Sequence, residues 1–156
     1  MEPTTLLDGA MGSELIKRGE YLPPHIWSAD LNLKNPDLVT QVHIDYIMAG
    51  AEYIITNTFR TTPRAFKKTG LFTKDAESTA YNSMQSALKS AYNAAQKKVP
   101  ILASIAPLED CYIPNKFPGV KAAEYEFFQI GEWLYNKSIY GFILETMNNL
   151  VETKIC

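Results

Sequence analysis

The sequence has little of several features that would place a protein in a special class. Among 156 residues only two are cysteines, Cys111 and Cys156, too few and too far apart for a disulfide framework or a clustered metal site. No apolar run approaches the roughly 20 residues that cross a bilayer. Residues 1–5 lack the basic and long apolar segments of a signal peptide. We therefore expect a cytoplasmic protein without a membrane partner.

An excess of charge of one sign is also lacking. Fifteen basic and seventeen acidic residues give a net charge of −2, so no overall field would draw the chain to nucleic acid or anionic lipid. With 46% hydrophobic and 21% charged residues, the composition is that of an ordinary globular protein. We expect one domain, or a piece of one, over residues 1–156, with no linker, repeat or second domain.

Short apolar runs alternate with segments of helical periodicity. Each run ends in a polar cluster, and strands that alternate with helices predict an α/β fold with a parallel sheet. The four predicted strands are Thr4–Leu7, Tyr53–Ile55, Ile101–Ile105 and Tyr140–Leu144.

The helices between these strands have readable starts and buried faces. Asn35 can cap a helix that begins at Pro36 and ends near Gly50. A second helix is expected over about residues 74–97, a third over about residues 121–137, and a fourth begins near Asn148. The second helix should bury one stripe of side chains, namely Ala76, Ala80, Met84, Ala87, Leu88 and Ala91.

Polar residues at the strand ends are the natural site candidates, because ligands of parallel α/β folds bind at the carboxyl ends of the strands. These candidates are Asp8, Thr56, Asn57, Thr58, Ser104 and Glu145. Two carboxylates in one pocket can act as acid and base, hold a metal or bind an ammonium group, and the last makes the smallest demand on further residues. Capping of the following turns is an equally simple structural interpretation.

The two histidines receive no catalytic role. His43 lies one residue from the apolar stripe of the helix after Asn35, where a lone histidine is usually a packed structural residue. His25 lies in a loop beside Trp27 and can line the mouth of a pocket. No serine lies in a Gly-x-Ser-x-Gly elbow, which argues against a hydrolase.

Several motifs in fixed order make the sequence resemble the first half of the homocysteine S-methyltransferase family domain. The resemblance is carried by Leu6–Leu15, Trp27-Ser28-Ala29, Pro36–Val39, Val42–Tyr46, Ala49–Phe59, Ala103–Tyr112, Glu132-Trp133-Leu134 and Leu144–Asn148. It implies a (β/α)₈ TIM barrel, of which this chain supplies about the first four βα units, a half-barrel.

The resemblance also implies a reaction, in which a methyl group passes from a donor to the thiol of homocysteine and forms methionine. In the family, zinc held by three cysteine thiolates takes up the homocysteine sulfur. Those cysteines belong to the later half of the domain, and neither Cys111 nor Cys156 matches them. We therefore expect no zinc and no catalytic residue in this chain. The donor is not identified, although a sulfonium compound is slightly favoured over betaine or a methylfolate.

What the resemblance implies for this chain is the amino-acid end of the pocket. Asp8 and Glu145 would hold the homocysteine ammonium group. Main-chain N–H groups of Gly9, Ala10 and Met11 would take the carboxylate. Thr56, Asn57 and Thr58 would form the pocket floor.

Two hypotheses of different class follow. In the first, the chain is or comes from an enzyme of methionine biosynthesis whose second half lies elsewhere. In the second, it is a non-catalytic half-barrel that binds an amino acid or a partner protein. Open strand edges beside apolar side chains favour self-association or pairing with a C-terminal half-barrel.

Overall fold

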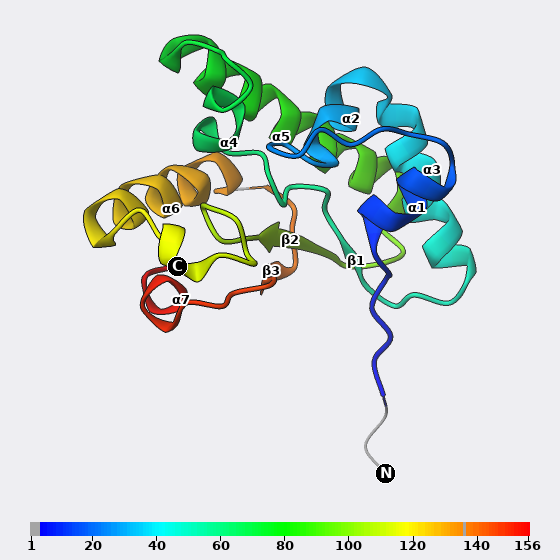
Figure 1. The fold of residues 1–156 in the computed structure, drawn as a ribbon. Coiled ribbons are helices and arrows are strands. Elements are labelled where there is room, and N and C mark those ends of the chain that lie inside the picture. The colour runs from blue at the N-terminus through cyan, green and yellow to red at the C-terminus, as the bar shows by residue number, and fades with distance from the viewer. Residues whose placement is uncertain (1–3, 136) are drawn as a thin grey trace.

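The computed structural model describes residues 4–135 and 137–156. Asn136, which falls in the helix predicted over about residues 121–137, lies outside the described residues, as do the first three residues. A three-stranded parallel sheet of order β1-β2-β3 lies at the centre of the fold (Figure 1). The strands are β1 (Ile54–Ile55), β2 (Ile101–Ile105) and β3 (Gly141–Leu144). Each has a helix-containing crossover before the next strand, as parallel pairing requires.

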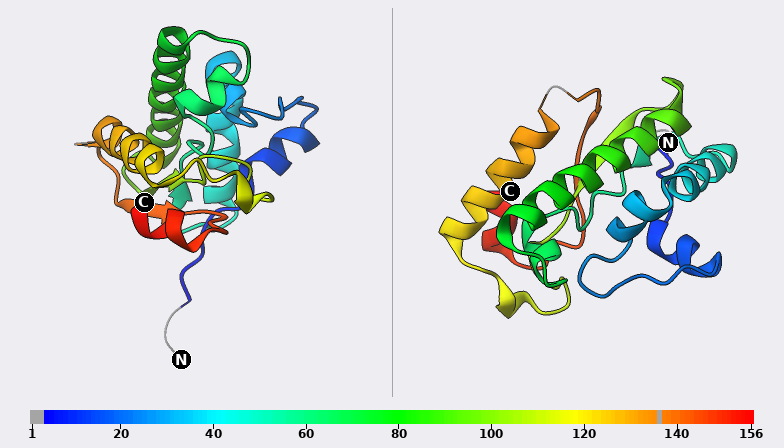
Figure 2. Two further views of the ribbon diagram at one scale, coloured as in Figure 1. Left: turned by 60° about the vertical axis from the view of Figure 1, so that its left-hand side comes forward. Right: turned by 90° about the horizontal axis from the view of Figure 1, so that it is seen from above.

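Seven α-helices and one short 3-10 helix are found among the described residues. The helices are α1 (Met11–Lys17), α2 (Ala29–Lys34), α3 (Pro36–Met48), α4 (Pro63–Lys67), α5 (Thr73–Ala95), α6 (Val120–Leu134) and α7 (Leu150–Ile155), with 3-10 helix η1 (Pro114–Lys116). Viewed from above, α5 runs diagonally across the molecule, with α2 and α3 on one side of it and α6 on the other (Figure 2, right). None of these helices is both long and apolar enough to cross a membrane.

The predicted helices are confirmed, with small shifts at their ends. The Asn35 side chain accepts the N–H of Leu38, which makes it the cap of α3. Helix α5 ends at Ala95 rather than Lys97 because Gln96 and Lys97 adopt left-handed backbone angles, with φ of 47° and 62°. Every residue of the predicted α5 stripe is buried.

The expectation of four strands is not met within the described residues. In place of the strand Thr4–Leu7 there is an isolated parallel bridge between Leu7 and Tyr53. Leu6 and Leu7 are 52% and 41% exposed, so little packing holds this segment against the sheet. It is attached to the rest on one side only, and an open three-stranded sheet results instead of a four-strand half-barrel.

The core lies mainly between the sheet and the helices. One cluster joins Met84 and Leu88 of α5 to Ala103 of β2 and to the buried face of α6. A second cluster packs Ile54 and Ile101 against the end of α5. Burial of these apolar surfaces fixes β1 and β2, and with them the loops at their carboxyl ends. Strand β3 is held by its backbone pairing with β2.

Candidate functional site

The loops at the carboxyl ends of the strands surround a small cavity of about 180 Å³. It is lined by Gly9, Ala10, Met11, Gly12, Ser13, Trp27, Ser28, Ile55, Thr56, Asn57, Phe59 and Glu145. Six of the nine predicted site residues therefore line one cavity. The other three are Asp8 and Thr58, which lie directly beside lining residues in the chain, and Ser104, which hydrogen-bonds to Glu145.

Glu145 follows β3 and is tied to β2. Its Oε2 accepts a hydrogen bond from the hydroxyl group of Ser104, and its main-chain N–H donates to Ile105 O at 2.9 Å. Burial raises the pKa of the Glu145 carboxyl, and the negative charge of Asp8 raises it further, while the Ser104 hydrogen bond opposes both. The two acids are thus close enough to act on one another's charge.

Asp8 is hydrogen-bonded to the main chain of β1 and of the residue that precedes it. Its Oδ2 accepts the N–H of Ile55 at 2.9 Å, and its own N–H donates to Tyr53 O at 3.1 Å. The side chain is 3% exposed, and Oδ1 has no hydrogen-bond partner among the described residues. A buried carboxylate oxygen without a donor is costly, so Asp8 retains capacity to accept one.

The hydroxyl groups of Thr56 and Thr58 form a chain between β1 and β2. Thr58 Oγ1 donates to Ser104 O at 2.7 Å, so its single proton is used and Thr56 is the donor in the 2.8 Å bond between the two hydroxyls. Ser104 N–H in turn donates to Thr56 Oγ1 at 3.2 Å. This chain fixes the loop after β1 against the strand that carries Ser104.

The Asn57 side chain is used to anchor helix α2. Its amide nitrogen donates to Ser28 O at 3.0 Å and to Asn32 Oδ1 at 2.8 Å. Its Oδ1 accepts the Ser28 hydroxyl at 2.5 Å. Ser28 and Asn32 were not predicted as part of this network, since they contact Asn57 only in the folded chain.

Two glycines permit close approach at the cavity wall. A Cβ on Gly9 would lie 2.7 Å from the ring of Tyr46, and a Cβ on Gly12 would collide with the Trp27 indole. Both positions thus depend on glycine because of their neighbours, a signal that the sequence alone does not contain. Trp27 itself has a φ of 49°, and Thr146, which follows Glu145, has a φ of 53°.

The apolar wall of the cavity includes Phe59, which sequence reasoning did not select. It follows Thr58 directly, so its place at the end of the polar cluster was the available signal. His25 and Trp27 also line a neighbouring cavity of about 560 Å³ with Arg60 and Cys111. His25 is therefore at a pocket, as expected for a residue of that loop.

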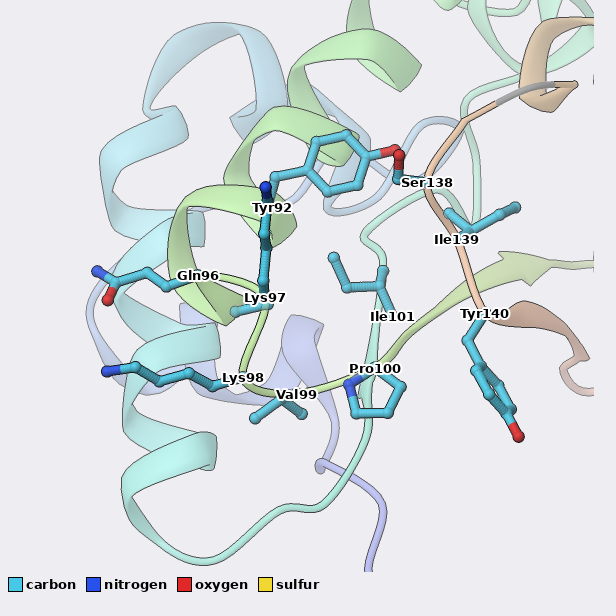
Figure 3. Close-up of a pocket in the computed structure, with 11 residues that line it drawn as sticks. Tyr92, Gln96, Lys97, Lys98, Val99, Pro100, Ile101, Ser138, Ile139 and Tyr140 are labelled. Atoms are coloured by element: carbon cyan, nitrogen blue, oxygen red, sulfur yellow. The ribbon is translucent and has the colours of Figure 1, made fainter.

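A larger cavity of about 790 Å³ lies at the opposite edge of the sheet, where β2 begins (Figure 3). It is formed by the end of α5, the turn Lys97–Ile101 and the segment Ser138–Tyr140. The described residues that line it include no predicted site residue and no acidic side chain. The predicted acids and polar residues therefore lie at the carboxyl ends of the strands, away from this larger cavity.

The described residues do not supply a set of zinc ligands. Cys111 lies in the loop after β2 and Cys156 follows α7, both as free thiols. No three His, Cys, Asp or Glu side chains in residues 4–135 and 137–156 are grouped to hold a metal ion. The donor set that the family resemblance implies for zinc does not fit the residues present.

Comparison with known sequences decides the family. The sequence profile named "Homocysteine S-methyltransferase" matches residues 5–156. The chain belongs to the homocysteine S-methyltransferase family. It is 47% identical over 66 residues to a homocysteine S-methyltransferase of Escherichia coli, a match over 42% of this chain and 21% of that protein. It is 40% identical over 74 residues to the homocysteine S-methyltransferase YbgG of Bacillus subtilis, over 47% of this chain and 24% of that protein.

Comparison of structures supports the same fold family. The metallated form of the homocysteine methyltransferase MmuM from Escherichia coli superposes with a TM-score of 0.78 at 28% identity. The match covers 99% of this chain and 58% of that structure. The chain thus spans little more than half the length of the solved relative, and an α/β fold of the TIM-barrel family is shown, with the sheet open.

Proposed function

We propose that this chain forms the amino-acid-binding half of a homocysteine S-methyltransferase, which transfers a methyl group from a sulfonium-type donor to the homocysteine thiol. The observation that carries the proposal is the single cavity shared by Glu145, Thr56 and the turn Gly9–Met11. At about 180 Å³ it is smaller than the roughly 300–1,000 Å³ typical of drug-sized ligands, which suits an amino acid.

In this proposal the charges of the ligand are divided between the two sides of the cavity. The ammonium group binds Glu145 and Asp8. Burial, and to a smaller extent the Asp8 charge, raise the pKa of Glu145, and a cation between the two acids would oppose both effects. The carboxylate accepts main-chain N–H groups of Gly9, Ala10 and Met11 at the start of α1. Thr56, Asn57 and Thr58 hold the floor in place. Left-handed backbone at Trp27 and Thr146 supports this placement, since such strain gathers at binding sites.

The described residues are assigned binding and orientation rather than activation of the thiol, because they provide no ligand set for zinc. We propose that a C-terminal half-barrel completes the enzyme. The exposed β3 side chains Phe142 and Leu144 support such a partner, because it would cover them. A cytoplasmic location stays a prediction.

A non-catalytic half-barrel that binds an amino acid is the second candidate. The observation that favours it is the placement of the two cysteines, since Cys111 lies in the loop after β2 and Cys156 follows α7, so they are not grouped as zinc ligands. Under this hypothesis the chain binds homocysteine or methionine, contains no zinc and transfers no methyl group. A second copy covering the open sheet edge would appear as a dimer.

Titration of the purified chain with L-homocysteine, with its zinc content and methyl transfer from S-methylmethionine measured in parallel, tests the proposal. Glu145→Gln and Asp8→Asn should each weaken binding about tenfold or more, because each removes a charged partner of the ammonium group. Glu124→Gln on the exposed face of α6 is the matched control. Unchanged affinity in both site variants would sink the assignment. Methyl transfer with one zinc per chain would exclude the non-catalytic candidate.

A further inference from the structure

A buried histidine lies next to Asp8 and has no hydrogen bond. His43 of α3 is 0% exposed, and neither ring nitrogen has a partner among residues 4–135 and 137–156. Its Nδ1 lies 3.7 Å from Asp8 Oδ2. An imidazole carries at least one N–H donor, and leaving it unpaired in the interior is unfavourable. The side chain thus has an unused donor near an acid with unused acceptor capacity.

The carboxylate can take this donor without losing the bond that it already has. Within the described part of the chain Asp8 Oδ2 accepts only the Ile55 N–H, and an ionised carboxylate offers about four lone-pair positions. Shortening the 3.7 Å separation to an ordinary charge-assisted bond of about 2.8 Å requires a shift of roughly 1 Å. A side-chain adjustment of that size accompanies ligand binding in many pockets.

The same face of α3 supports the cavity at a second point. Tyr46 lies three residues after His43, and its hydroxyl donates to Ala10 O at 3.3 Å. Residues three apart lie on one face of a helix. Helix α3 therefore reaches both the acid and the adjoining turn of the cavity. Asp8 also acts on Glu145, whose pKa is raised mainly by burial and further by the Asp8 charge.

We propose that His43 is a positioning residue, which donates its Nδ1–H to Asp8 Oδ2 and leaves Oδ1 to receive the ammonium group of the amino acid. This inference rests on the proposed function. The bond orients a carboxylate that has one other donor, and it keeps the imidazole in the Nδ1–H tautomer. His43 acts through Asp8, so it serves recognition of the amine and not the chemistry at sulfur.

Two ligands that differ only in the amine test this role. L-methionine and 4-(methylsulfanyl)butanoate share the thioether and the carboxylate, and titration calorimetry of the whole chain gives both affinities. His43→Leu should weaken methionine about tenfold or more and the amine-free analogue less than about threefold. His43→Asn, whose side-chain amide replaces the Nδ1–H donor, should restore most of the methionine affinity. Equal losses for both ligands, or no rescue by asparagine, would overturn the proposal.

A ligand-free measurement keeps this test separate from that of the proposed function. The chain has two histidines, so His25→Gln leaves the His43 ring as the one histidine signal in a ¹⁵N spectrum. We expect a protonated Nδ1 whose signal changes on Asp8→Asn. An unprotonated Nδ1, or a spectrum indifferent to Asp8→Asn, would contradict the role of His43. If the wild-type chain binds neither ligand, the proposed function fails and this spectrum alone decides the His43–Asp8 bond.

Discussion

The neighbouring strands β2 and β3 are both apolar, yet they are buried to very different extents. Ala103 of β2 is fully buried, whereas Phe142, its register partner on β3, is 55% exposed. Leu144 is 42% exposed, while its partner Ile105 packs against the main core cluster. Because paired residues of parallel strands point to the same face, the contrast comes from what covers each strand.

The helix layer explains the contrast. Helices α5 and α6 cover β2, and after β3 the chain continues into α7, which packs against α6. A strand covered on both faces has a continuous apolar sequence, and Gly141–Leu144 has that pattern. The sequence of β3 is therefore suited to more burial than the described residues provide. This difference supports the proposal that a C-terminal half-barrel covers β3.

The largest expected effect on stability is the difference between one leucine-to-alanine change in the core beside β2 and the same change on exposed β3. Leu88→Ala should lower the free energy of unfolding by about 2–5 kcal/mol, because the leucine is 1% exposed and its loss leaves a cavity. Leu144→Ala, the matched change on β3, should cost less than about 1 kcal/mol. Urea unfolding of the isolated chain measures both. A large loss at Leu144 would mean that β3 is already covered, for example by a second copy.

A change at Glu152 should have an intermediate effect on stability, because this residue links α7, which follows β3, to the loop that follows β2. This α7 residue is 3% exposed, and its Oε1 accepts the N–H of Leu108 in the loop after β2 at 2.8 Å. Glu152→Ala would leave that buried N–H unpaired and should cost about 1–3 kcal/mol. Glu152→Gln keeps an acceptor oxygen and should cost less.

The control for this change is Glu124→Ala on the exposed face of α6, which should alter stability by less than about 0.5 kcal/mol. Urea unfolding again supplies the free energies. If Glu152→Ala changed the free energy of unfolding as little as the control does, α7 would contribute little to the stability of the core. The weak packing seen for β3 would then also apply to α7.

Much of the well-packed part of the fold, which includes α5 and β2, could be predicted from the sequence. Helix α5 buries every side chain of its predicted stripe, and β2 has the predicted bounds, because a regular period and an apolar run are local signals. Helices α1, α2 and α4 were missed because their five to seven residues are too short to show a period. The segment Thr4–Leu7 was predicted as a strand from composition, but a strand also needs partners.

The candidate site was predictable in location but only partly in detail. The rule for parallel strand ends placed Thr56 and Glu145 together, and the structure brings both to one cavity. The bonds of Asn57 to Ser28 and Asn32 depend on how α2 packs, so no sequence pattern announces them. His43 was interpreted as a structural residue, and its proximity to Asp8 arises only in the folded chain, where α3 packs beside β1.

The smallest expected effect comes from two acids that follow the two strands and respond to pH in opposite directions. Burial alone would raise the pKa of Glu109, after β2, but hydrogen bonds and charges of Lys68 and Arg64 lower it. Burial and the Asp8 charge raise the pKa of Glu145, after β3. An unfolded glutamate titrates near pH 4.3, so the two residues shift stability on opposite sides of that value.

The signs follow from linkage. Glu109 stabilises the fold above its unfolded pKa, and this contribution is lost as pH falls through its lowered folded pKa, so Glu109→Gln should lower stability at neutral pH and matter less in acid. The Glu145 contribution is present below its unfolded pKa and lost as pH rises through its raised folded pKa. Glu145→Gln should therefore gain stability relative to wild type as pH rises. Urea unfolding from about pH 3 to pH 7 measures both. If the two substitutions changed stability with the same dependence on pH, the pKa of Glu145 would be lowered in the folded chain, as that of Glu109 is. Cationic groups would then lie near the end of β3 as they do near the end of β2.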